Sequence, residues 1–365
     1  MDERIARQRL HNQFVTRPGP GDPADVVRWL GAVQAQEYPF ARWALGLRMR
    51  SGTIDAAIER AFDEGRILRT HVMRPTWHFV TAEDIRWMLE LTGPRVHRAM
   101  ASYNRKQGLD APTLRKAMKV LERSLASGHS KTRADVAHEL ERKGVAARGL
   151  RLGLLMLYAE LEAVVCSGPR EGKQFTYALL SERAPNARRL TRDEALAELT
   201  KRYFASHGPA TIRDFVWWSG LKVADARRGL EMNRAESESV NGLAYWRLGQ
   251  QAVRRSIGGL VHLLPIYDEY LIAYRDREAV PHGPANPSAA ARSLTFQHAL
   301  VIGGQLAGTW RTVRNANGVA ITVIPLRRLS NTERAGIREQ ADRYGRFAGS
   351  PVALSFNPAV TGRTR

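Results

Sequence analysis

The chain has 365 residues, and its 44% hydrophobic and 25% charged residues exclude wholesale disorder. That length exceeds what one hydrophobic core supports, so two or three modules are expected. The 56 Lys and Arg residues against 36 Asp and Glu give a net charge of +20, which favours a polyanionic partner, nucleic acid above all, although solubility alone would also explain the charge.

A set of predicted helices followed by a pair of predicted strands recurs three times along the chain. In the first set, these patterns fall on 24–35, 39–48 and 54–64, then 67–73 and 76–80. In the second set, they fall on 112–126, 133–143 and 149–162, then 163–168 and 173–179. In the third set, helices over 192–206, 212–219 and 223–232 precede a hairpin that turns at Asn241-Gly242. This order is the plan of a winged helix.

The C-terminal part of the chain is richer in predicted strands. These β-like runs fall on 260–265, 298–304, 308–314 and 319–326, and a final helix is predicted over 331–346. Asn317-Gly318 predicts a tight hairpin between the last two runs. Stretches rich in Pro and Gly indicate loops over 17–23 and 282–287.

Four helix starts carry a capping box, in which a Thr hydroxyl and an acid three residues later satisfy free backbone N–H groups. They are Thr81–Asp84, Thr132–Asp135, Thr191–Glu194 and Thr211–Asp214. Together the elements predict an α+β fold with three tandem winged-helix units and a β-rich C-terminal region. The expected boundaries are 1–108, 109–187, 188–258 and 259–365.

Cofactor and metal chemistry are not indicated. The one cysteine, Cys166, and scattered histidines make no zinc-ligand set, and neither a phosphate-loop glycine pattern nor a nucleophile elbow is present. Cys166 lacks an intrachain partner and is interpreted as a small buried hydrophobe, which favours a reducing compartment. Residues 1–14 lack the apolar core of a signal peptide, and no apolar run approaches the ~18 residues of a membrane span. We expect a cytoplasmic, nucleoid-associated protein with no obligate protein partner evident.

Basic side chains lie at positions that contact DNA in a winged helix, namely the recognition helix and the wing. Arg148 and Arg151 begin the third helix of the second unit, the position of a recognition helix, and Arg170 and Lys173 lie in its wing. Each one taken alone is more often a solvated surface charge. The remaining candidates for DNA contact are Arg69, Arg74, Trp77 and Arg275.

Several other residues have a structural and a functional interpretation. Trp77 can stack on an exposed base or pack on its own core, and His71 and His78 are expected to be structural or at the surface. Asp268 and Glu269 precede a helical pattern, so helix capping is their expected role.

Gln34-Ala35-Gln36 follows an apolar helical pattern and stops short of Pro39, which biases the preceding residue away from helix. On a continuing helix, residues two apart diverge by roughly 200°, whereas in an extended segment they point the same way. Two convergent amides can hold one water, but neither is basic enough to take its proton. By composition alone, Gln34 and Gln36 are interpreted as ordinary surface glutamines.

Four segments together resemble the AlkZ-type bacterial DNA glycosylases over nearly the whole chain. They are VQAQEYPFARWALGLR (33–48), LRTHVMRPTWHFV (68–80), HGPATIRDFVWWSGL (207–221) and LLPIYDEYLIAYRDR (263–277). The resemblance implies tandem winged helices in a C-shape around DNA and excision of N7-alkylated purines, including interstrand crosslinks in some members. The family's signature of Gln, an apolar residue and Gln falls on Gln34, Ala35 and Gln36; a related branch has Asp at the position of Gln36, so this chain resembles the glutamine branch. For the family's lesion-sensing hairpin, 303–308 is a candidate.

The resemblance thus implies a monofunctional glycosylase that acts on duplex DNA containing alkylated purines, with Gln34 and Gln36 as catalytic residues. An N7-alkylated purine is cationic and leaves without a strong acid, so amide oxygens need only stabilise the oxocarbenium-like sugar and aim a water at C1′. Two alternatives remain open. They are a winged-helix regulator or lesion binder without chemistry, and a scaffold whose charge serves solubility.

Overall fold

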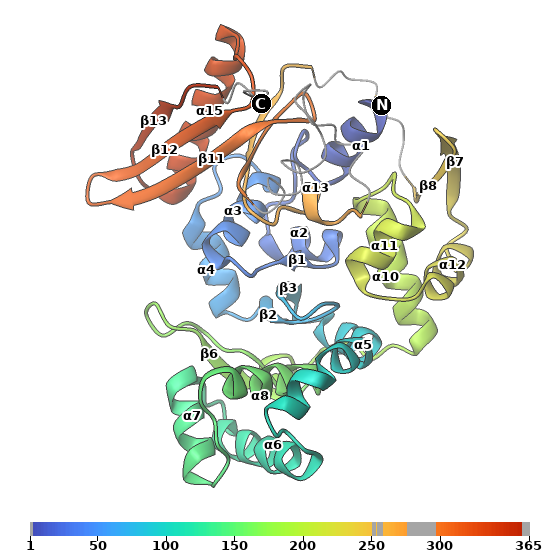
Figure 1. Ribbon diagram of the computed structural model, residues 1–365, viewed down its shortest axis with the longest axis vertical. Helices are drawn as coiled ribbons and strands as arrows, with labels where there is room; N and C mark the ends of the chain where they lie inside the picture. The colour runs from blue at the N-terminus through green and yellow to red at the C-terminus, as the bar shows by residue number, and fades with distance from the viewer. Residues whose placement is uncertain (1–2, 250–252, 254–257, 276–296, 360–365) are drawn as a thin grey trace, which may run out of the picture.

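A computed structural model of the chain describes residues 3–249, 253, 258–275 and 297–359 and has a mixed α+β architecture (Figure 1). Within that part, four sheets have the strand orders β1-β3-β2, β4-β6-β5, β7-β8 and β13-β12-β11-β10-β9. Helices of the described part are all too short or too polar to cross a membrane. The loop expected over 282–287 lies outside the described residues.

The first set of elements starts with a helix that is shorter than predicted. The chain runs through α1 (Glu3–Asn12), α2 (Pro23–Leu30), β1 (Val33–Gln34), α3 (Tyr38–Arg48), α4 (Asp55–Asp63), β2 (Ile67–His71), β3 (Trp77–Thr81) and α5 (Ile85–Lys106). The expected helix over 24–35 is wrong at its end, because Gly31 takes a positive φ of 83° and stops α2. The two residues of β1 then pair with β3.

The second set repeats the same order. Its elements are α6 (Ala111–Leu125), β4 (Lys131–Thr132), α7 (Arg133–Arg142), α8 (Gly149–Leu161), β5 (Val165–Ser167) and β6 (Thr176–Leu179). Helix α9 (Leu180–Arg183) follows it. Figure 1 shows α6, α7 and α8 together at one end of the long axis.

The third set has α10 (Arg192–Ser206), α11 (Ile212–Ser219), α12 (Val223–Met232), β7 (Glu236–Val240) and β8 (Leu243–Arg247). An isolated bridge between Ala210 and Trp246 stands where the other sets have a short strand. Asn241 and Gly242 form the predicted turn, both with positive φ. In all three sets, one helix and a short strand or bridge precede two helices and two strands.

Three of the four predicted capping boxes are confirmed, at Thr132, Thr191 and Thr211. The prediction at Thr81–Asp84 is wrong, because Thr81 still belongs to β3 and α5 begins at Ile85. The Thr81 hydroxyl donates to Asp84 but caps no helix N–H, and the Asp84 carboxylate also accepts hydrogen bonds from Trp87, Arg188 and Arg202. A Thr-x-x-Asp pattern in the sequence does not show whether the acid caps a helix or binds residues far along the chain.

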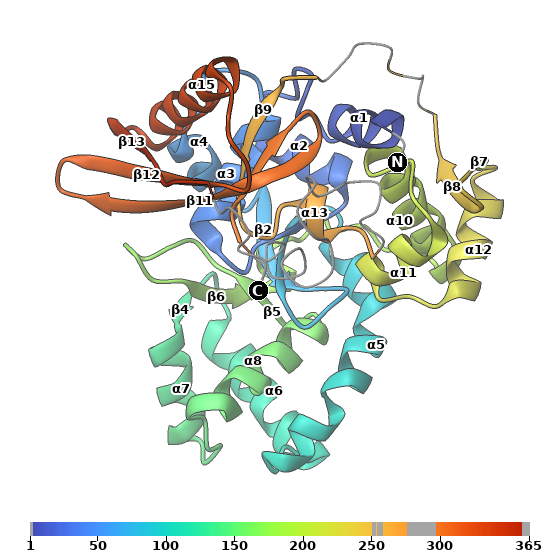
Figure 2. The same cartoon turned by 45° about the horizontal axis from the view of Figure 1, so that its top comes forward.

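The C-terminal elements are β9 (Val261–Leu264), α13 (Glu269–Ile272), β10 (Ala299–Ile302), β11 (Gln305–Asn315), β12 (Gly318–Pro325), α15 (Asn331–Ala348) and β13 (Val352–Phe356). The turn between β11 and β12 lies one residue earlier than predicted, because Asn315 pairs with Gly318. Within 303–308, Gly303 and Gly304 form the tight turn between β10 and β11. The longer β11–β12 hairpin projects from the body of the molecule (Figures 1 and 2).

The C-terminal sheet shares a hydrophobic core with the first set of helices. That cluster runs from α2, α3 and α4 to β9, β10, β11, β12 and α15, and Trp43 anchors it by donating its indole N–H to the Leu263 carbonyl at 2.9 Å. A separate cluster lies within 109–179. Residues far apart in sequence therefore cooperate in positioning α3, the helix that follows the Gln-x-Gln segment.

One buried ion pair fastens α3 to the segment before α13. The Arg48 guanidinium donates to both Asp268 oxygens, at 2.7 and 2.8 Å, and both side chains are almost fully buried. Two parallel charge-assisted bonds fix the direction as well as the distance between the partners. Arg48 also donates to Gln13, which follows α1.

Replacement of Arg48 by Met is expected to lower the free energy of unfolding by about 3–5 kcal/mol, because Asp268 would remain buried without its cation. Urea denaturation measures the change. The control is Arg148→Met, which removes an exposed arginine and should change stability by less than about 0.5 kcal/mol. Equal stability of the two variants would contradict a structural role for the pair.

Candidate active site

The Gln-x-Gln segment lies between α2 and α3 in a short extended stretch. Gln34 ends β1, where it faces His78 of β3, and Gln36 follows just before α3. The Ala35 N–H donates to the Trp77 carbonyl at 2.7 Å, which continues the pairing by one residue. The chain has thus left the helix before Gln34, the condition under which two glutamines two apart can serve one site.

The Gln34 side chain is held by a guanidinium. Arg74, in the turn between β2 and β3, donates from Nη2 to Gln34 Oε1 at 3.3 Å and approaches His78 Nε2 at 3.4 Å. Burial, with the charge of Arg74 added, lowers the pKa of His78 to about 3, so its ring is neutral. Nδ1 of His78 lies 2.8 Å from the Thr76 carbonyl, which leaves Nε2 as an acceptor for Arg74.

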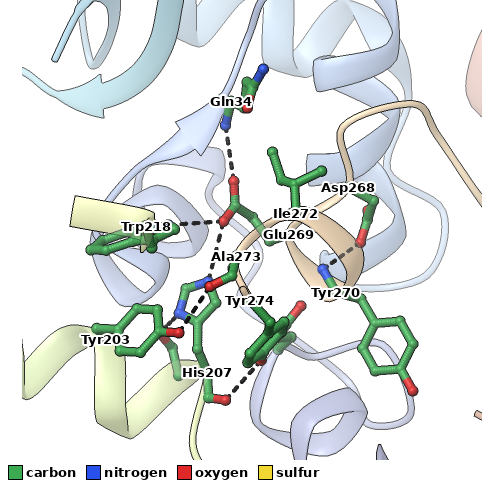
Figure 3. A network of polar contacts seen from close by, with 12 residues as sticks. Gln34, Tyr203, His207, Trp218, Asp268, Glu269, Tyr270, Ile272, Ala273 and Tyr274 are labelled. Atoms are coloured by element: carbon green, nitrogen blue, oxygen red, sulfur yellow. Dashed lines mark hydrogen bonds and ion pairs between the residues drawn. The ribbon is translucent and has the colours of Figure 1, made fainter. Parts of the chain in front are cut away.

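The Gln34 backbone is held from the opposite direction by Glu269. Its Oε1 accepts the Gln34 N–H at 3.0 Å, while Oε2 accepts from Trp218 Nε1 at 3.1 Å and lies 3.3 Å from His207 Nε2 (Figure 3). This carboxylate is fully buried. Glu269 therefore connects β1 with α11 and with the end of α10.

Arg69 of β2 binds the backbone of the Gln-x-Gln segment. It donates to the carbonyls of Ala35 at 2.9 Å and Gln36 at 3.4 Å, and its guanidinium lies 4.2 Å from the centre of the Trp77 ring. Burial lowers the pKa of Arg69 to about 10, so it remains a cation at neutral pH. The half-buried Gln36 side chain makes no hydrogen bond within the described residues, whereas its backbone is fixed.

This arrangement offers two amides, one anchored and one available, rather than a free carboxylate. Arg74 is the charged group on the Gln34 side chain, and Glu269 meets only its backbone. Amides can orient a water and stabilise a cation through their oxygens, but they cannot remove a proton. Among the described residues, no three His, Cys, Asp or Glu side chains gather in a metal-binding arrangement.

The sequence-predicted candidates fall into two groups. Arg69, Arg74 and Trp77 surround Gln34 and Gln36, and Trp77 lies half-buried between Arg69 and His71. The other candidates lie elsewhere, at the start of α8, in the β5–β6 hairpin and after α13; they are Arg148, Arg151, Arg170, Lys173 and Arg275.

The residues of the second group differ in how exposed their side chains are and in whether those side chains already bind other parts of the chain. Lys173 and Arg275 are exposed, and Arg148 is exposed beside Glu141. Arg151 donates to the carbonyls of Ala146 and Gln107. Arg170 binds Glu59 of α4 at 2.7 Å and is largely covered, so it joins the hairpin to the first set of helices.

Glu269 is the main residue of the candidate site that sequence reasoning missed. Helix capping is confirmed for Asp268, which precedes α13 and accepts the Tyr270 N–H at 2.9 Å, but it is wrong for Glu269. The Glu269 side chain turns back to Gln34, which lies 235 positions earlier. His71 and His78 are both buried, and His71 contacts Glu160 at 2.6 Å. No local pattern marks such long-range contacts.

Comparison with known proteins gives two findings. The sequence matches the family described as DNA glycosylase AlkZ-like over residues 27–347. The fold is similar to that of the Streptomyces sahachiroi DNA glycosylase AlkZ, with a TM-score of 0.79 and 22% identity over 96% of this chain and 98% of that one. A search of curated proteins found no match.

Replacement of Arg69 by Met is expected to lower the free energy of unfolding by about 1–3 kcal/mol, because the carbonyls of Ala35 and Gln36 lose their donor. Chemical denaturation measures it. Lys173→Met, which removes an exposed cation from a turn, is the control and should be nearly neutral. A stable Arg69→Met protein would mean that the guanidinium does not hold the segment.

Proposed function

The chain belongs to the AlkZ-like DNA glycosylase family, and we propose that it hydrolyses the N-glycosidic bond of N7-alkylated purines in duplex DNA with Gln34 and Gln36 as its catalytic residues. The observation that carries this proposal is the fixed Gln-x-Gln segment, whose backbone is bound by Glu269 and Arg69 and whose first amide is bound by Arg74. A fixed backbone that carries one anchored and one available amide is suited to catalysis by positioning.

The chemistry of an N7-alkylated purine suits amides. Alkylation makes the base cationic, so it departs without protonation by a strong acid. The sugar then develops oxocarbenium character as the C1′–N9 bond breaks, and nearby oxygen dipoles stabilise it. A water adds at C1′ and its surplus proton passes to solvent water, while the base leaves as a neutral N7-alkylpurine. Neither step needs a side chain that changes its protonation state.

The two glutamines are assigned different tasks. Arg74 already occupies one lone pair of Gln34 Oε1, and its positive charge opposes a second cation at that oxygen. We therefore assign the orientation of the water to Gln34. Gln36, half-buried and with a side chain that makes no hydrogen bond within the described residues, is assigned the direct stabilisation of the sugar cation.

We interpret each set of helices and strands as a winged helix. In the second set, α8 then corresponds to a recognition helix that begins next to Arg148, and the β5–β6 hairpin corresponds to a wing with Lys173 at its turn. The tips of this hairpin and of β11–β12 lie on the same side of the molecule in both views (Figures 1 and 2). Arg69 is assigned to bracing the catalytic segment, because its donors face the protein's own carbonyls.

A non-catalytic lesion binder or regulator with the same basic surface is the alternative. A base-release assay distinguishes it from a glycosylase. A lesion binder or regulator would bind duplex DNA, yet it would release no base from duplexes that carry N7-methylguanine, a bulky N7 adduct or an N7 interstrand crosslink. The same panel identifies the lesion class. A regulator would also prefer one operator sequence over unrelated undamaged duplexes.

Gln36→Ala is expected to slow single-turnover release of the alkylated base by roughly 100-fold, as removal of one preorganised dipole does elsewhere. Its dissociation constant for the same DNA should stay within about threefold, because the amide contributes little to backbone binding. The measurements are base release by chromatography and DNA binding by fluorescence anisotropy. Gln107→Ala, at the end of α5, is the matched control; equal rates for both variants would refute the catalytic role of Gln36.

Lys173→Ala and Arg148→Ala are each expected to weaken DNA binding about equally for unrelated sequences and to reduce the salt slope of binding by about 1. Anisotropy titrations over a series of salt concentrations measure both quantities. Arg327→Ala, which removes a cation that is paired with Glu333 at the start of α15, serves as the control. Unchanged slopes for the first two variants would place the DNA-binding face elsewhere.

A further inference from the structure

The backbone N–H of Gln34 points away from its own sheet. β1 is an edge strand in the order β1-β3-β2, and the Ala35 N–H donates to β3 at the Trp77 carbonyl. Because N–H groups alternate in direction along an antiparallel strand, the N–H of Gln34 faces outward. At that place Glu269 Oε1 accepts it at 3.0 Å.

The surroundings of the Glu269 carboxylate keep it ionised and fixed as the acceptor of the Gln34 N–H. Burial of a carboxylate is costly unless hydrogen-bond donors replace water. Trp218 and His207 donate to its second oxygen, and neither residue has an exposed side chain. Burial alone raises the pKa of Glu269, but His207 and the Gln34 N–H more than offset this and hold the pKa below its usual value, so the group stays ionised.

The segment that carries Glu269 is itself immobilised. The neighbouring Asp268 is bound at both oxygens by Arg48, at the C-terminal end of α3, while Gln34 lies just before the N-terminal end of the same helix. The two adjacent acids thus bind both ends of the stretch from β1 through α3. Figure 3 shows Glu269 between Gln34 on one side and Trp218 and His207 on the other.

We propose that Glu269 is a positioning residue for base excision, which fixes the Gln34 backbone in register and couples it to α10 and α11 through His207 and Trp218. The inference rests on the catalytic role proposed for Gln34. Glu269 does not touch the substrate. It acts by removing freedom from the strand that carries the first amide, and a misplacement of about 1 Å in such a group slows catalysis by roughly 100-fold.

Glu269→Gln tests the proposal with almost no change in volume. The carboxylate serves Gln34 with one oxygen and Trp218 with the other, whereas an amide has one oxygen and a donor NH₂ group. Either the Gln34 backbone N–H or the Trp218 indole N–H must therefore face the NH₂ group of the new amide, which is also a donor. We expect single-turnover base release to fall between 10- and 100-fold, while the dissociation constant for lesion DNA stays within about threefold.

A second change tests which contact matters. Phe in place of Trp218 removes the indole N–H, so the amide oxygen of Glu269→Gln can turn to the Gln34 N–H. The amide NH₂ group then faces His207 Nε2, which accepts once the imidazole proton moves to Nδ1 beside the Ser206 hydroxyl. The double variant Trp218→Phe/Glu269→Gln is expected to recover about fivefold or more of the lost rate, despite lower thermal stability. No recovery would contradict the proposal. If Glu269→Gln does not fold, Glu269→Asp, which keeps the charge and withdraws it by one methylene, must show the same separation of rate from binding.

The matched control is Asp84→Asn. Asp84 is also a fully buried acid with an indole donor, Trp87, but its other partners are Thr81, Arg188 and Arg202 rather than the Gln-x-Gln segment. The Asp84→Asn substitution should lower the melting temperature without slowing base release by the folded protein. A wild-type rate in Glu269→Gln, or equal slowing in Asp84→Asn, would overturn the inference. Absence of base release by the wild-type protein would instead refute the proposed function.

Discussion

Two adjacent acids buried at the start of α13 are the constraint on which the candidate site depends. A carboxylate away from water needs donors on both oxygens, and those donors must come from wherever the chain can supply them. Asp268 takes them from Arg48, and Glu269 takes them from Gln34, Trp218 and His207. The need to satisfy two charges therefore draws together β1, α3, α11 and the end of α10.

The arginines near Gln34 serve the protein's own structure, although the chain carries a net charge of +20. Arg69 binds two backbone carbonyls, and Arg74 binds an amide oxygen and a neutral imidazole. Their charge still contributes to the local potential, which attracts phosphates and opposes a cation. This balance agrees with the proposed mechanism, in which Gln36 meets the sugar cation and more distant residues such as Lys173 meet the phosphates of the DNA.

The shared core explains why the site is not a property of one module. Trp43 of α3 bonds to β9, so the C-terminal sheet and the first set of helices pack as one cluster. Residues 109–179 contain a cluster of their own, but α8 and β5 also share a second cluster with β2 and β3, and Arg170 binds Glu59 of α4. The Gln-x-Gln segment is therefore held by a core to which the C-terminal sheet contributes, next to a second core that three sets of elements share.

The sequence by itself determined the local elements, because apolar periodicity, Thr-x-x-acid caps and the Asn241-Gly242 turn act within a few residues. It placed the helices of the second and third sets within one residue at either end and singled out Gln34 and Gln36 by resemblance. It extended the helix before Gln34 too far and made Glu269 a cap. Only the tertiary structure decided those points, since the strand at Gln34 exists through pairing with β3 and the fate of a buried charge depends on donors that lie far away along the chain.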